Sequence, residues 1–140
     1  MDQRMISAVR KVLADKVGLS GHDLTVVEGH VGGLALRIRQ HVDFGRQKQR
    51  AFTEGVRIAF DAYMAGHNGE RMEVESMVST AMHNLRGIGK IRPEMEDALR
   101  RDLVHHITGI HGVGKRIFEQ RMEEKIVGIT PRREPVRKAA

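Results

Sequence analysis

The sequence predicts an all-α fold, a compact bundle of about five or six helices with one long central helix and an extended basic C-terminal tail. Apolar residues recur at the helical period along most of the chain. Proline, which interrupts helices, is absent before Pro93. Hydrophobic residues make up 40% of the 140 residues, which is enough for one core. We therefore expect residues 1–128 to form a single helical domain.

Three helices are expected in the first half of the chain. An apolar stripe over residues 5–17 predicts the first helix, and Ser20 is expected to cap the second. The glycines within residues 28–33 are expected to break that second helix, although a glycine-weakened helix is the alternative. One long helix is expected over residues 34–64, because its apolar residues fall on one side at about 100° per residue. They are Ile38, Val42, Phe52, Val56, Phe60 and Tyr63.

The second half is expected to hold three further helices. A Gly-His-Asn-Gly turn at 66–69 precedes a helix that stops at Gly87. Pro93 suits the first turn of the next helix, where its missing N–H does no harm. The last helix is expected to start near Val113 and to end at Gly128, and residues 129–140 read as an extended basic tail.

Charge and composition limit the classes of function. The formal net charge is +6, and residues 86–140 carry 13 Lys and Arg against 8 Asp and Glu. Basic excess attracts polyanions, of which nucleic acid is the commonest, although many soluble proteins are basic without such a role. The absence of cysteine excludes disulfides and thiolate chemistry. No apolar run approaches membrane-spanning length and no signal-peptide core is evident, so we expect a cytoplasmic protein without membrane contact.

A nine-residue pattern occurs twice, 25 positions apart, at 82–90 and 107–115. Each copy reads apolar-x-x-apolar-x-Gly-apolar-Gly-Lys. Two glycines around one apolar residue allow a sharp turn between helices and leave backbone N–H groups exposed. Exposed N–H groups beside a lysine are typical of a phosphate-binding site.

The repeated pattern resembles the helix-hairpin-helix motif of DNA-repair and recombination proteins, within residues 79–123. In that family a Gly-apolar-Gly hairpin contacts phosphates through backbone amides. The resemblance implies backbone binding with little base readout. The alternative interpretation is that these glycines only end helices. The implied phosphate ligands are Gly87, Gly89 and Lys90 in the first copy, and Gly112, Gly114 and Lys115 in the second.

Four arginines are spaced to lie in a row on the long helix expected over residues 34–64. At about 100° per residue they fall within roughly 20° of one line. Such a row could follow a phosphate backbone with forked donors, or it is the solvated side of an amphipathic helix or a protein interface. The four are Arg39, Arg46, Arg50 and Arg57.

No metal site, cofactor or catalytic residue is expected. Of the eight histidines, His105, His106 and His111 lie near one another in sequence, and His83 could approach them. Neighbouring histidines on a helix diverge by about 100°, however, and no H-E-x-x-H motif occurs.

The sequence therefore predicts a non-enzymatic accessory subunit that binds the backbone of DNA or RNA with little sequence specificity. Arg116, Arg132 and Arg133 complete the candidate binding residues. Other protein subunits or self-association are expected as further partners. Two alternatives remain: a structural subunit of a repeating assembly such as a phage, secretion or similar particle, and a small helical regulator or inhibitor of a nucleic-acid enzyme.

Overall fold

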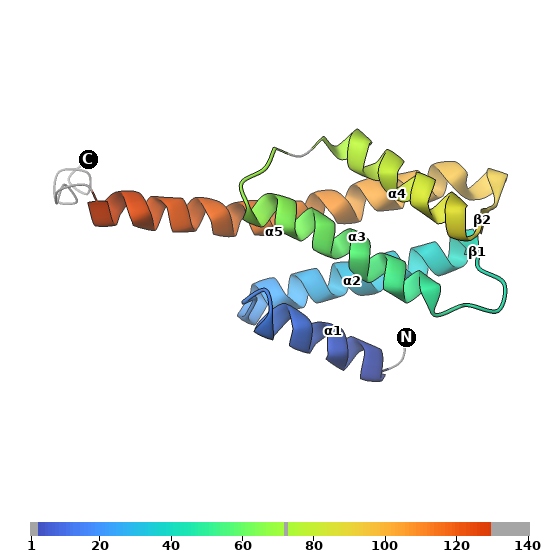
Figure 1. Cartoon of the computed structure of the whole chain (residues 1–140), viewed down its shortest axis with the longest axis horizontal. Helices are drawn as coiled ribbons and strands as arrows, with labels where there is room; N and C mark the ends of the chain where they lie inside the picture. Colours follow the sequence, from blue (N-terminus) through green and yellow to red (C-terminus); the bar gives the residue numbers. More distant parts are fainter. Residues whose placement is uncertain (1–2, 72, 130–140) are drawn as a thin grey trace.

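The computed structural model describes residues 3–71 and 73–129, and it is built almost entirely from helices (Figure 1). This confirms the all-α class. In chain order the elements are α1 (Gln3–Asp15), α2 (Gly21–His41), β1 (Val42–Asp43), α3 (Arg50–His67), α4 (Val74–Ile88), β2 (Lys90–Ile91), the short 3-10 helix η1 (Pro93–Met95) and α5 (Glu96–Ile129).

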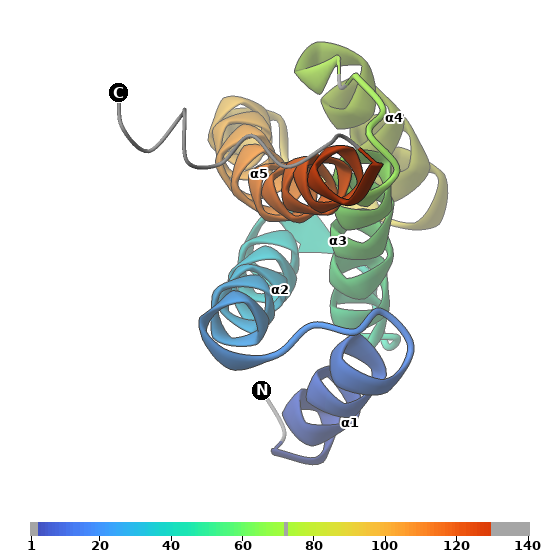
Figure 2. The same ribbon diagram turned by 90° about the vertical axis from the view of Figure 1, so that its left-hand side faces the viewer.

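Three helices, α2, α3 and α5, pack against one another to form the centre of the bundle (Figure 2). α4 lies mainly on α5, whereas α1 lies on the other side of the bundle, against α2. The 34-residue helix α5 is the longest element, and its C-terminal part extends beyond the other helices (Figure 1). No helix in the described ranges combines the length and apolarity needed to cross a bilayer.

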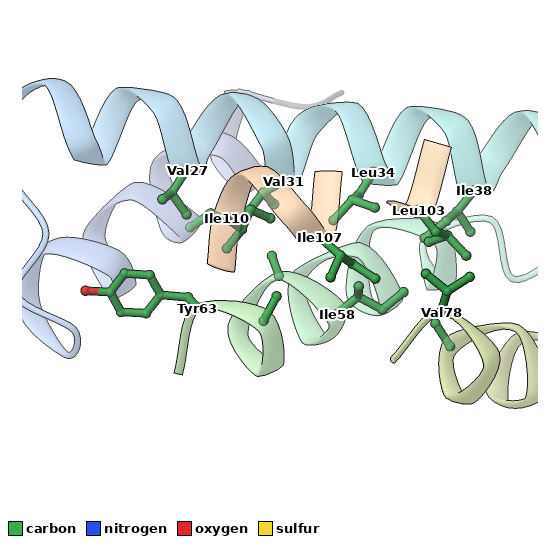
Figure 3. Close-up of a cluster of buried hydrophobic side chains, with 14 of the residues drawn as sticks. Val27, Val31, Leu34, Ile38, Ile58, Tyr63, Val78, Leu103, Ile107 and Ile110 are labelled. Atoms are coloured by element: carbon green, nitrogen blue, oxygen red, sulfur yellow. The ribbon is translucent and has the colours of Figure 1, made fainter. Parts of the chain in front are cut away.

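One apolar core runs between the central helices (Figure 3). Spacings of three and four residues place the apolar side chains of each helix on its inner side. Tyr63 is the largest of the fully buried residues in the core, and the residue is 1% exposed. The labelled core residues are Val27, Val31, Leu34 and Ile38 of α2, Ile58 and Tyr63 of α3, Val78 of α4, and Leu103, Ile107 and Ile110 of α5.

Small residues on α3 allow its neighbours to come unusually close. The buried side of α3 carries Ala51, Gly55, Ala59, Ala62 and Gly66. A Cβ placed on Gly55 would lie 3.0 Å from the backbone nitrogen of Ala35 on α2, which is tighter than ordinary van der Waals contact. One side of α3 therefore carries small side chains, and α2 and α5 pack close to its backbone there.

The long helix expected over residues 34–64 is wrong. α2 ends at His41, and α3 begins only at Arg50. Between them, Val42 and Asp43 pair with Ile91 and Lys90 in an antiparallel ladder. The turn that follows places Gly45 at a φ of 63°, a left-handed conformation that favours glycine. The Asp43 Oδ1 atom accepts a hydrogen bond of 2.8 Å from the Gly45 N–H, which fixes this turn.

Two expected breaks are also wrong. α2 continues through Gly29, Gly32 and Gly33, so the weakened-helix alternative holds at 28–33. α5 continues from Glu96 to Ile129, so no separate helix begins near Val113. Neighbouring elements press against Gly33 of α2 and Gly114 of α5, where packing offsets the low helix propensity of glycine, about 1 kcal/mol. Gly29 and Gly112 meet no atom within 4 Å and are carried by the rest of their helices.

Other expectations are confirmed. Of the turn expected at 66–69, residues 68–69 form it, with Gly69 at a φ of 75°, whereas Gly66 and His67 still belong to α3. α4 ends one residue after Gly87, and Pro93 is the first residue of η1. Ser20 occupies the N-cap position of α2, although its side chain makes no capping hydrogen bond. The basic tail lies outside the described residues, apart from Ile129 at the end of α5.

Candidate nucleic-acid interface

Two loops that are distant in sequence meet at one end of the bundle, where β1 pairs with β2 (Figure 1). The first loop, residues 44–49, joins β1 to α3, and the second contains Gly89 and β2. A Cβ on Gly89 would lie 2.8 Å from the Val42 side chain and 2.9 Å from the Asp43 carbonyl oxygen. Gly89 is therefore required for the close approach of the two loops.

This end of the bundle holds most of the net charge of the chain. Residues 37–50 and 86–102 carry ten Lys and Arg against five Asp and Glu, a net of +5. The whole chain carries +6, so the remaining residues together are close to neutral. The positive charge is therefore concentrated where the two loops meet.

Nine cationic side chains in residues 37–50 and 86–102 are exposed. We call six of them the basic end: Arg39, Arg46, Lys48, Arg50, Lys90 and Arg92. Within residues 3–71 and 73–129, none of the six takes part in an ion pair.

Most acidic groups at this end have other partners. Asp102 lies 3.3 Å from the His41 Nε2 atom and 3.9 Å from the Arg37 Nε atom. Glu96 pairs with Arg86 on α4. Asp43 accepts the turn-forming hydrogen bond from Gly45. In the described part of the chain, none of these three carboxylates forms an ion pair with a residue of the basic end.

The arginine row expected from helical periodicity does not form. Arg39 lies in the last turn of α2, Arg46 in the loop, and Arg50 at the first position of α3. Three of the four arginines nevertheless meet at the basic end, because the loop returns the chain toward the end of α2. Arg57 lies further along α3 and pairs with Glu54 on the same helix.

The first Gly-apolar-Gly-Lys copy contributes a lysine to the basic end, but it does not form a turn with backbone amides available for a phosphate. Gly87 lies inside α4. Gly89 is extended, with φ −158°, and its N–H donates to the Leu85 carbonyl oxygen at 2.9 Å. That amide completes the end of α4 and is not available for a phosphate. Lys90 is exposed in β2.

The second copy forms no hairpin, because the whole segment 107–115 lies within α5. Gly112 and Gly114 are helical, and Gly114 is buried against α3. Lys115 is exposed near the Gly69 turn, at the other end of α3 from Arg50. Arg116 pairs with Asp23 of α2. Arg132 and Arg133 lie outside the described residues.

Lys48 and Arg92 belong to the basic end but were not predicted from the sequence. A signal for the first was present, because residues 46–50 read Arg-Gln-Lys-Gln-Arg with no apolar residue. Five polar residues in succession contain no position for the buried side of a helix, which is typical of a loop. Arg92 joins the basic end only through strand pairing, which leaves no such local signal.

Comparisons of the chain with protein-family models, with curated proteins and with solved structures find no match.

Proposed function

We propose that this protein is a non-enzymatic subunit that binds the phosphate backbone of nucleic acid through its basic end. The observation that supports this most directly is the concentration of charge: a net of +5 lies within residues 37–50 and 86–102. Six exposed cations from two loops and two helix ends share that surface. A polyanion contacts many such cations at once, whereas a single small anion contacts only a few.

The proposed mechanism is neutralisation of phosphates with release of condensed counterions. Four of the six cations are arginines, whose planar forks each contact two phosphate oxygens. Phe44 is the aromatic residue of the 44–49 loop, and it is half-buried against the core. Base stacking therefore contributes little, and binding is expected to show weak sequence preference.

Salt titration tests the proposal. Binding is measured by fluorescence anisotropy with duplex DNA, single-stranded DNA and RNA of mixed sequence, across a range of salt concentrations. The test variant carries Arg46→Gln, Lys48→Gln and Lys90→Gln. The matched control carries Lys11→Gln, Lys16→Gln and Lys125→Gln, which removes the same charge from exposed positions elsewhere.

For duplex DNA the wild-type affinity is expected to fall steeply with salt. The test variant is expected to lower the slope of log K against log salt by about 0.9 for each lost phosphate contact, or roughly 2 to 3 in total. The control is expected to keep the wild-type slope. Equal losses in both variants would mean that only net charge matters, and a flat wild-type response would contradict the proposal.

A second candidate function is that of a structural subunit in a repeating protein assembly. Past the Gly69 turn, α5 extends away from the other helices (Figure 1). Met122, Ile126 and Val127 on this part are exposed by 39%, 58% and 40%. Several large apolar side chains on one exposed helix are typical of a protein-binding surface. A sizing column run with and without nuclease distinguishes the two: a large species that survives nuclease favours the assembly.

A further inference from the structure

α2 and α5 each carry a His-x-x-Gly segment, and the two segments face each other. They are residues 30–33 on α2 and 106–109 on α5. A Cβ on Gly33 would lie 2.5 Å from the His106 Cε1 atom, and a Cβ on Gly109 would lie 2.5 Å from the His30 Nε2 atom. Each glycine thus makes room for the imidazole of the opposite helix.

This arrangement gathers three imidazoles. The Nδ1 atoms of His30 and His106 are 2.8 Å apart. The His105 ring centroid lies 4.9 Å from that of His106 and 5.8 Å from that of His30. One ring nitrogen from each of the three side chains lies within 4.8 Å of the other two. Two helices therefore supply three nitrogen ligands to one small volume.

The two inner imidazoles are held neutral. Burial lowers the pKa of His106 to about 4, with further lowering by His30 and His105 and an opposing effect from Asp102. Burial, followed by the charge of His105, also lowers the pKa of His30. Neutral imidazole offers the lone pair that a metal ion requires. Neither ring then has to lose a net charge, and the Nδ1–H that lies between the two rings has only to move to the Nε2 atom of its own ring before a metal binds.

We propose that His30, His105 and His106 form a binding site for a divalent late first-row transition metal, with Zn²⁺ as the first ion to test. Imidazole ligands suit such ions, whereas Mg²⁺ and Ca²⁺ prefer oxygen ligands. A three-histidine set leaves a fourth position for water or another ligand. The site would link α2 to α5. Arg39 lies on α2 and Asp102 on α5, both nearer to the basic end than the three histidines are.

The geometry needs two adjustments, a small one within the inner pair and a turn of the His105 side chain. At Zn–N distances of about 2.0–2.1 Å in a tetrahedral site, ligand nitrogens lie roughly 3.3 Å apart. The pair His30–His106 must therefore open from 2.8 Å by about half an ångström. His105 is exposed, so its side chain is free to turn toward the other two. Without metal, one Nδ1–H of the inner pair donates to the other Nδ1 atom.

The test uses full-length, untagged protein that has been stripped with a chelator. Zn²⁺ binding is followed by calorimetry, and Co²⁺ binding by its visible absorption, which reports tetrahedral coordination. The variants are His30→Gln, His105→Gln and His106→Gln. The control is His83→Gln on α4, because His83 is exposed, as His105 is, and lies outside the cluster. Gly33→Ala is a further variant, since its methyl group would displace the His106 ring.

We expect one Zn²⁺ per chain, a tetrahedral Co²⁺ spectrum and no binding of Mg²⁺. Each cluster variant is expected to weaken Zn²⁺ binding by more than about 100-fold, beyond the loss typical of an outer-shell change. His83→Gln is expected to bind like wild type. His105→Gln alters an exposed side chain, so a folded variant is expected, and circular dichroism verifies this. Absence of Zn²⁺ binding, or equal binding by His105→Gln and wild type, would leave only a histidine–histidine hydrogen bond and overturn the proposal.

Discussion

Gly66 of α3 and Gly114 of α5 lie backbone to backbone where the two helices cross. A Cβ on Gly66 would stand 2.8 Å from the Lys115 backbone nitrogen, and one on Gly114 would stand 2.8 Å from the His67 backbone nitrogen. Backbone atoms cannot turn aside as a flexible side chain does. The crossing therefore depends on glycine at both positions.

Gly114→Ala is expected to destabilise the fold. The added methyl group forces α3 and α5 apart, and overpacking of this kind costs about 1–3 kcal/mol, more than the helix propensity of alanine returns. Urea unfolding followed by circular dichroism measures the change. Unchanged stability would mean that the two helices do not cross at this point.

Gly112→Ala is expected to do the opposite, although it lies only two residues away. Gly112 is exposed and helical, and a Cβ there meets no atom within 4 Å. Alanine in the interior of a helix is favoured over glycine by about 0.5–1 kcal/mol. The same unfolding experiment would show a gain in stability. A loss would instead indicate a turn at Gly112, as in a helix-hairpin-helix motif.

These two glycines show how far local sequence predicts this fold. Apolar periodicity predicted the all-α class, and the Gly69 turn and the end of α4 carry local signals. Gly112 and Gly114 carried the same signal as a turn, because glycine weakens a helix in isolation. Only the partner helix shows why glycine is needed, since Gly114 packs against Tyr63 and His67 of α3. Such a tertiary contact has no counterpart in the local pattern.

The candidate sites follow the same principle. Four of the predicted binding residues lie at the basic end: Arg39, Arg46, Arg50 and Lys90. Helical periodicity did not indicate the path of the chain that brings them there. The pairing of β1 with β2 fixes this path. Each strand has only two residues, too few to show an alternating pattern in the sequence. His30 joins His105 and His106 across 75 and 76 residues, so sequence proximity pointed instead to His111. His111 lies elsewhere, with its Nε2 atom 3.2 Å from the Glu70 carbonyl oxygen.

Arg121→Gln is expected to raise the pKa of His67. Burial lowers that pKa below its ordinary value, and the positive charge of Arg121 lowers it further. The His67 ring also stacks on Tyr63, whose hydroxyl oxygen lies 3.3 Å from the His67 Nδ1 atom. Removing the arginine leaves burial alone, so the pKa moves back toward 6.5 without reaching it. Titration of the imidazole signals by NMR measures the shift.

The control for this titration is Lys125→Gln, which removes one charge from the exposed part of α5 further from His67. Its effect on the pKa of His67 is expected to be smaller.

The lowered pKa of His67 also makes stability depend on pH. Because the folded pKa is lowered, His67 favours folding while it is neutral, and this contribution is lost as the pH falls below the unfolded value near 6.5. Arg121→Gln narrows the difference between the folded and the unfolded pKa of His67. It should therefore reduce the loss of stability that His67 causes in acid. Equal titration in both variants would place Arg121 away from His67.

Lys90→Gln and Lys115→Gln form a matched pair for nucleic-acid binding, because each removes the lysine that ends one copy of the repeated pattern. Lys90 belongs to the basic end, whereas Lys115 lies by the Gly69 turn at the far end of α3. With duplex DNA, Lys90→Gln is expected to lower the salt slope by about 0.9 and to weaken binding to all sequences alike. Lys115→Gln is expected to leave the slope unchanged. If the two variants lose affinity equally, phosphates contact both ends of the bundle, and the basic end is not the binding surface.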